Sequence, residues 1–133
     1  MPPIAAAPSL DGYRILLVED AGDIRDVLGL LLRSEGAEVR TASTGRAALE
    51  MAADWDFDVL LTDLGLPDLG GEHLIREILG MKGRRPRVVA MTGFGEPYHA
   101  RARAAGAGAV LTKPLDWAAL KGAMTAGGEA LAA

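Results

Sequence analysis

Five polar side chains follow directly after short apolar runs: Glu19, Asp20, Asp63, Thr92 and Lys113. If they met, they would supply three carboxylates, one hydroxyl and one ammonium. Two carboxylates about 4 Å apart repel each other by roughly 4 kcal/mol at an effective dielectric constant near 20. A hard cation offsets this repulsion, and magnesium keeps coordination positions for water and phosphate oxygens. The set therefore predicts a site for a divalent cation, Mg2+ or Mn2+, together with an anionic ligand.

Phosphoryl transfer is the chemistry that fits these residue types. An aspartate beside a divalent cation can attack phosphorus and form an acyl phosphate. Lys113 would neutralise the oxygens of the moving phosphoryl group, and the Thr92 hydroxyl would donate a hydrogen bond to one of them. A zinc site is a poor competitor, because the sequence has no cysteine and its two histidines, His73 and His99, lie in separate helical segments.

These residues can meet only if the runs before them are neighbouring strands. Continuous apolar runs, typical of strands covered on both faces, occupy residues 14–18, 58–62, 87–91 and 109–112. Residues 37–42 alternate between polar and apolar and predict an edge strand. Longer amphipathic segments separate the runs, which is the β-α-β order of an α/β fold. We predict an open five-stranded parallel sheet with helices on both faces and with ligands at the carboxyl ends of its strands.

The segments between the strands carry apolar residues at helical spacing. The predicted stripes are Ile24, Val27, Leu28 and Leu31, then Ala47, Ala48 and Met51, then Leu74, Ile75, Ile78 and Leu79. A fourth segment, residues 97–105, has the weakest stripe, so we expect it to be the least firmly packed helix. Ser43, Thr44 and Asp116 are candidate N-terminal helix caps.

Composition indicates one globular domain. The 133 residues are 50% hydrophobic and 24% charged, with a formal net charge of −4. An acidic chain of this kind argues against direct nucleic-acid binding, and no run approaches the length of a membrane span. The absence of cysteine is compatible with a reducing compartment, so we expect a cytoplasmic protein without membrane insertion. We expect a flexible tail or linker over residues 1–11, one domain over 12–125, and a flexible tail over 126–133.

Four motifs in register resemble the response-regulator receiver family, over nearly the whole ordered chain. They are residues 15–20 (ILLVED), 61–71 (LTDLGLPDLGG), 91–93 (MTG) and 111–114 (LTKP). The resemblance implies a flavodoxin-like fold with strand order 2-1-3-4-5 and five helices. It also implies a phosphoprotein of two-component, phosphorelay signal transduction, which takes its phosphoryl group from a histidine kinase or a histidine phosphotransfer protein. Such a domain is a signalling module rather than an enzyme.

The resemblance also assigns roles to individual residues. Asp63 is the phospho-acceptor that becomes an aspartyl phosphate, and Asp20 and Asp63 coordinate magnesium directly. Glu19 assists through water, and the backbone carbonyl of Gly65 supplies a further ligand. The peptide bond before Pro114 is the candidate cis bond.

One position departs from the family pattern. The family often has Tyr or Phe three residues before the lysine, where the ring swings inward as the threonine moves. Here that position is Val110, whose side chain is stiff at χ1. We therefore hypothesise that Phe94 and the loop over residues 93–97 carry more of the response, with the small Gly93 leaving room for the phosphoryl group. By resemblance, the face made by the fourth helix, fifth strand and fifth helix binds the downstream protein, and the domain is a monomer or a weak homodimer.

Two other functions stay open. An aspartyl-phosphate phosphatase usually has a second aspartate two positions after the nucleophile, where this chain has Gly65. A phosphorylation-independent docking module of the same fold would not need the acid pair, the acceptor, the threonine and the lysine. Both a single-domain protein and a receiver of a hybrid histidine kinase fit the sequence.

Overall fold

Strands and helices alternate along the whole of the computed structural model, which describes residues 9–125. The elements are β1 (Arg14–Val18), α1 (Gly22–Ser34), β2 (Glu38–Ala42), α2 (Gly45–Asp54), β3 (Val59–Asp63), α3 (Gly71–Leu79), β4 (Arg87–Thr92), α4 (Tyr98–Ala105), β5 (Ala109–Thr112) and α5 (Trp117–Thr125). All strand pairs are parallel, and the order is β2-β1-β3-β4-β5. The predicted α/β fold and strand order are therefore confirmed. Within residues 9–125, no helix is long and apolar enough to cross a membrane.

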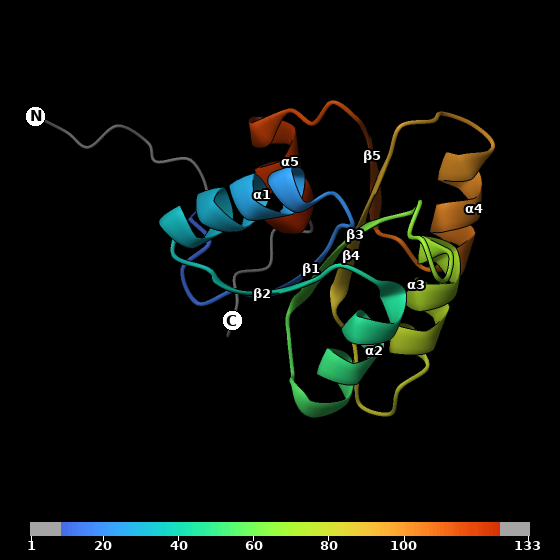
Figure 1. Ribbon diagram of the computed structural model, residues 1–133, viewed down its shortest axis with the longest axis horizontal. Coiled ribbons are helices and arrows are strands. Elements are labelled where there is room, and N and C mark those ends of the chain that lie inside the picture. The colour runs from blue at the N-terminus through green and yellow to red at the C-terminus, as the bar shows by residue number, and fades with distance from the viewer. Residues whose placement is uncertain (1–8, 126–133) are drawn as a thin grey trace, which may run out of the picture.

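Helices cover both faces of the sheet (Figure 1). On one face, Leu28 and Leu32 of α1 and Leu120 of α5 pack against alternate residues of β1, β3 and β4. On the other face, α2, α3 and α4 pack against the intervening residues of those strands and against Val110 of β5. Because the strands between the two layers are buried on both faces, their apolar runs are continuous.

The predicted stripe of α1 is wrong in part. Of its four residues only Leu28 is buried, and Leu32 joins it in the core. The other large apolar side chains of this helix are exposed: Ile24, Val27, Leu30 and Leu31. Residues 27–32 are apolar at every position except Gly29, so spacing alone did not identify the buried face.

The helix ends and α4 agree with the sequence. Thr44, rather than Ser43, caps α2 by accepting a hydrogen bond from the N–H of Ala47 at 3.1 Å. The Asp116 carboxylate accepts a hydrogen bond from the N–H of Ala119 at 2.8 Å. In α4 only two alanines, at positions 102 and 105, are buried. This helix therefore has little apolar contact with the sheet, as its weak stripe predicted.

β5 is the edge strand that the expected strand order requires, and Val110 alone in it is buried, although its sequence is a largely apolar run. One domain boundary differs from the expectation. Leu10 was expected in the N-terminal tail, but its side chain is fully buried and its N–H donates to the Glu35 carbonyl at 3.2 Å. The buried side chain and this hydrogen bond hold the segment against the domain. The other predicted tail residues, 1–8 and 126–133, lie outside the described part of the chain.

Candidate functional site

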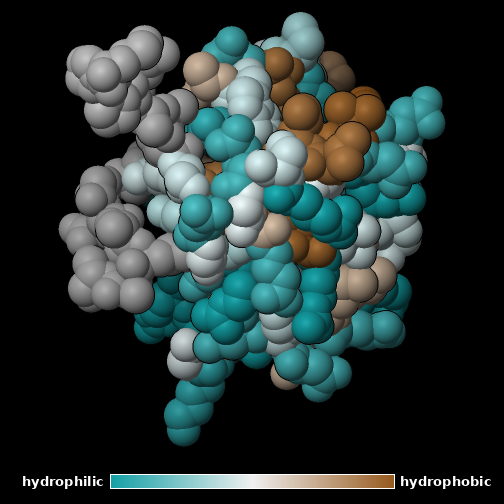
Figure 2. All heavy atoms as spheres, turned by 90° about the vertical axis from the view of Figure 1, so that its left-hand side faces the viewer, coloured by the Kyte–Doolittle hydropathy of each residue, from teal (hydrophilic) through white to brown (hydrophobic). Residues whose placement is uncertain are grey.

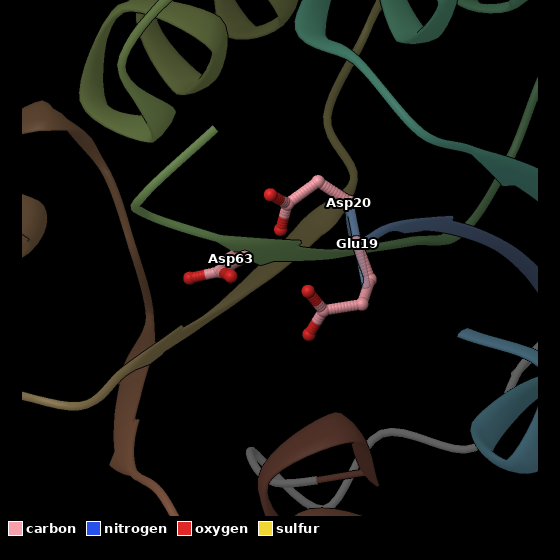
Figure 3. Close-up of side chains that lie close together, drawn as sticks. All are labelled: Glu19, Asp20 and Asp63. Atoms are coloured by element: carbon pink, nitrogen blue, oxygen red, sulfur yellow. The ribbon is translucent and has the colours of Figure 1, made fainter. Parts of the chain in front are cut away.

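The acidic side chains gather where β1 and β3 end. These strands are neighbours, with Val18 opposite Thr62, so Glu19 and Asp20 emerge beside Asp63 (Figure 3). One carboxylate oxygen from each of the three residues lies within 4.8 Å of the others. The structure thus brings together the three carboxylates that the sequence placed at one edge of the sheet.

Lys113 directly follows β5, which lies beside β4 on the side away from β3, and its side chain reaches the acidic group. Its N–H donates to the Thr92 carbonyl at 2.7 Å, which ties the end of β5 to the end of β4. Its Nζ lies 3.0 Å from Glu19 Oε1 and 3.0 Å from Asp63 Oδ2. Burial by itself lowers the pKa of the Lys113 ammonium, but hydrogen bonds to Glu19 and Asp63 outweigh it, and the pKa is raised overall. The lysine therefore stays charged and bridges the two carboxylates.

Glu19 is the most deeply buried of the acids, with 1% of its surface exposed. Burial raises the pKa of its carboxyl, while hydrogen bonds from Lys113 and from the N–H of Ala21, at 3.2 Å, act in the opposite direction. Asp20 is exposed, and Asp63 is largely buried. Asp63 Oδ1 accepts from the N–H of Gly65 at 3.1 Å. Asp63 is thus held on both oxygens, and Asp20 presents the most accessible carboxylate.

The donor set fits a hard divalent cation. Three carboxylates face one ammonium, so the site has an excess of negative charge when its groups are ionised. Oxygen ligands are those that Mg2+ and Ca2+ prefer. Glu19, Asp20 and Asp63 are the residues that could hold such an ion. The role of the Gly65 carbonyl as a ligand stays a prediction.

Thr92, the last residue of β4, is buried, and the residue before it lies opposite Asp63 in the sheet. Its Oγ1 accepts a hydrogen bond from the N–H of Phe94 at 3.1 Å. A Cβ at Gly93 would meet no atom within 4 Å, so the space beside Thr92 is open. The Lys113–Pro114 bond is cis, as predicted, and Glu96–Pro97 is a second cis bond that the sequence did not suggest.

Two residues that hold the chain around Asp63 were not identified from the sequence. A Cβ at Gly71 would lie 2.6 Å from the carbonyl oxygen of Asp63, so the return of the chain over β3 requires glycine there. Asp68 accepts from the N–H groups of Gly45 and Arg46, both at 2.8 Å, and so fastens the β3–α3 loop to the start of α2. These backbone hydrogen bonds, chiefly that from Arg46, lower the pKa of Asp68. The only sequence signal was the Gly70-Gly71 pair closing the motif.

An apolar surface adjoins the acidic group. Its hollow is lined by Asp23, Ile24, Val27, Leu28, Lys113, Pro114 and Leu115. Figure 2 shows a hydrophobic patch on the face of the molecule that includes α1. Two residues of α1 that line the hollow are exposed, with Ile24 43% and Val27 57% exposed. Lys113 borders both the hollow and the carboxylates.

Relatives with known names match over most of the chain. A family model described as the response regulator receiver domain matches residues 15–125. The cell cycle response regulators CtrA of Brucella ovis and Brucella canis are each 32% identical over 101 residues, which cover 76% of this chain and 44% of theirs. The chain thus spans less than half the length of these relatives.

Solved structures resemble the fold closely. A response regulator receiver domain protein from Clostridium thermocellum is 30% identical, with a TM-score of 0.78, over 85% of this chain and 91% of that one. A response regulator from Burkholderia pseudomallei, solved with a phosphorylated aspartic acid, a calcium ion and citrate, is 25% identical. Its TM-score is 0.78, over 84% of this chain and 66% of that one. The motifs, the fold and these matches agree: the chain belongs to the family of response regulator receiver domains.

Proposed function

We propose that Asp63 accepts a phosphoryl group from the phosphohistidine of a partner histidine kinase or histidine phosphotransfer protein, in a magnesium-dependent reaction. Phosphorylation of Asp63 then changes the affinity of the domain for a downstream protein. The observation that carries the proposal is the shared ion pair of Lys113 Nζ with Glu19 and Asp63, beside three carboxylate oxygens within 4.8 Å. The Burkholderia pseudomallei relative, which holds a phosphorylated aspartic acid and calcium, supports the same chemistry here.

In the proposed reaction a carboxylate oxygen of Asp63 attacks phosphorus. The new bond joins this oxygen to phosphorus, the bond from phosphorus to the donor's imidazole nitrogen breaks, and the imidazole leaves. Bound Mg2+ would reduce the repulsion between the incoming phosphoryl oxygens and the carboxylates. Lys113, already 3.0 Å from Asp63 Oδ2, would turn its ammonium toward a phosphoryl oxygen, and the Thr92 hydroxyl would donate to another. Glu19 would hold Lys113 in position throughout.

The apolar surface of α1 supports a docking site for a helix of the phosphodonor. Exposed apolar patches rimmed by polar groups mark interaction surfaces. This patch is continuous with the reaction site, because Lys113 lines the hollow and also contacts Asp63. A histidine on a helix seated beside Val27 and Leu115 would therefore reach the acceptor. We further propose that the downstream protein binds the face of α4, β5 and α5.

Acetyl phosphate with Mg2+ tests the acceptor assignment. We expect the intact mass of the protein to increase, the increase to be absent in Asp63→Asn, and EDTA to prevent it. Asp54→Asn is the matched control, because Asp54 is an exposed carboxylate at the end of α2, away from the site. An unchanged mass in the unmodified protein would refute the proposal and favour the phosphorylation-independent docking module. Turnover of a small phosphate ester would favour a phosphatase.

The docking surface has a separate test. Val27→Ser should slow transfer from a phosphorylated histidine phosphotransfer protein several-fold, while phosphorylation by acetyl phosphate stays unchanged. Ala53→Ser, at an exposed position on α2, is the control. Equal slowing with both donors would show that Val27 acts on the acceptor site rather than on docking.

A further inference from the structure

Two exposed aromatic rings lie together just after the end of β4. Phe94, in the β4–α4 loop, is 64% exposed, and Tyr98, the first residue of α4, is 40% exposed. Their ring centroids are 5.2 Å apart, and the planes are inclined by 35°. Within the described residues, the other large apolar side chains as exposed as these all lie on α1. Figure 1 shows this loop leaving the end of β4 and crossing to α4.

A hydrogen bond connects this aromatic pair to the reaction site. The Phe94 N–H donates to Thr92 Oγ1 at 3.1 Å. The same hydroxyl is the group that must donate to a phosphoryl oxygen on Asp63 under the proposed function. A hydroxyl can accept one hydrogen bond while it donates another, but if Oγ1 moves toward the phosphoryl group, its distance and angle to the Phe94 N–H change. The backbone of Phe94 is therefore coupled to the position of the Thr92 hydroxyl.

Tyr98 extends the connection to α4 and α3. The Arg101 guanidinium lies 5.6 Å from the centre of the Tyr98 ring, and Arg101 Nε is 3.2 Å from Glu72 Oε1 of α3. His99 Nε2 lies 3.1 Å from Thr112 Oγ1 of β5. These contacts are largely solvent-exposed, and α4 itself buries little apolar surface. Weak exposed contacts of this kind rearrange at small cost, so a displaced Phe94 can move the start of α4.

The sequence position that usually carries a rotating aromatic cannot do so here. Val110 is buried in the core beneath α4, where it packs with Ala102 and Ala105. Its branched side chain has no ring to turn. The aromatic groups near Thr92 are instead Phe94 and Tyr98, on the solvent side of the loop.

We infer that Phe94 and Tyr98 form an aromatic switch. The Thr92 hydroxyl holds Phe94 in place while Asp63 is unmodified, and it releases Phe94 when it turns to the phosphoryl group. This inference rests on the proposed phosphorylation of Asp63. The Thr92–Phe94 hydrogen bond is present without phosphorylation, so the first half of the switch has a test of its own. Thr92 is a positioning residue in this role.

Fluorine NMR of protein labelled with 4-fluorophenylalanine measures the switch directly. The sequence contains two phenylalanines, so the spectrum has two protein resonances. Phe57 is the internal control, since it is buried and packs against Trp55 with ring centroids 5.8 Å apart, just before the amino-terminal end of β3. In the unphosphorylated protein, Thr92→Ala should shift the Phe94 resonance, and Thr92→Ser, which keeps the hydroxyl, should not. Tyr98→Ala should also shift it, by removing the neighbouring ring.

Acetyl phosphate and Mg2+ are then added, with intact mass recorded on the same samples. We expect the Phe94 resonance to shift in proportion to the phosphorylated fraction, with Phe57 unchanged. In Thr92→Ala we expect no such shift at the same phosphorylated fraction, as measured by intact mass. A mass increase without movement of the Phe94 resonance would overturn the switch but leave the proposed function intact. Absence of a mass increase would overturn the proposed function and the release step with it. A Phe94 resonance that is identical in Thr92→Ala and the unmodified protein would overturn the hydrogen-bond link whatever the mass.

Discussion

A methyl group at position 71 should disturb Asp63, the proposed phospho-acceptor, without altering any charged group. Gly71 begins α3, and its N–H donates to the Leu64 carbonyl at 3.0 Å, which brings the chain back over the end of β3. A Cβ at this position would lie 2.6 Å from the Asp63 carbonyl oxygen and 2.6 Å from the Leu64 Cα. Both are backbone atoms, so no side-chain rotation relieves the contact.

The size of the effect follows from these distances. Ordinary contact begins at 3.4 Å, so the atoms must separate by several tenths of an ångström. Overpacking of this kind lowers the free energy of unfolding by about 1–3 kcal/mol. A misplacement of about 1 Å at a reacting group slows a reaction by about 100-fold, so we expect Gly71→Ala to slow phosphorylation of Asp63 by about tenfold or more.

Urea unfolding and the rate of mass increase with acetyl phosphate measure the two effects. Gly70→Ser is the matched control, because a Cβ at Gly70 would meet nothing within 4 Å and serine is a favoured N-cap residue. Its free energy of unfolding should stay within about 0.5 kcal/mol of the unmodified protein, and its phosphorylation rate should not change. If Gly71→Ala matched the unmodified protein in both measurements, the close approach of α3 to β3 would not be what holds Asp63 in place.

Three further outcomes are expected. Mg2+ at ten times its dissociation constant should raise the free energy of unfolding by about 1.4 kcal/mol. Thermal melts with and without Mg2+ should show this gain in stability, and the Asp20→Asn variant should lose most of the gain. Arg84 donates to two carbonyls at the end of α2, both at 2.6 Å. Arg84→Lys should lower the free energy of unfolding by about 1–3 kcal/mol and so lower the urea midpoint. Arg85→Lys, at an exposed position, should leave both unchanged. Backbone N–H donors lower the pKa of Asp68 in the folded state. The ionised Asp68 carboxylate therefore stabilises the fold fully at neutral pH, and this stabilisation is lost as the pH falls through that pKa. Urea unfolding should accordingly show Asp68→Asn as less stable than the unmodified protein at pH 7, with the difference shrinking in acid; a difference independent of pH would contradict this.

The sequence alone determined the fold class and the main members of the site. Continuous apolar runs predicted buried parallel strands, because a strand covered on both faces has no polar side. Glu19, Asp20, Asp63, Thr92 and Lys113 could be identified because the carboxyl ends of such strands meet at one edge of the sheet. The departure at Val110 was also visible without coordinates.

Other features could not be predicted, because they depend on contacts between segments distant in the chain. The run over residues 27–32 is apolar nearly all round, so only packing against the sheet and α5 decided that Leu28 and Leu32 face inward and Val27 and Leu30 face solvent. The need for glycine at position 71 arises from the approach of α3 to β3, which no local pattern encodes.

The tertiary structure also decided which groups share hydrogen bonds. Lys113 belongs to a common strand-end motif, but its simultaneous contact with Glu19 and Asp63 depends on the placement of β5 beside β4 and of β3 beside β1. Likewise, the bond from the Phe94 N–H to Thr92 Oγ1 depends on the path of the β4–α4 loop. Residue types and spacing determine which chemistry is available, whereas distances and directions between side chains are set only when the sheet and its two helical layers pack together.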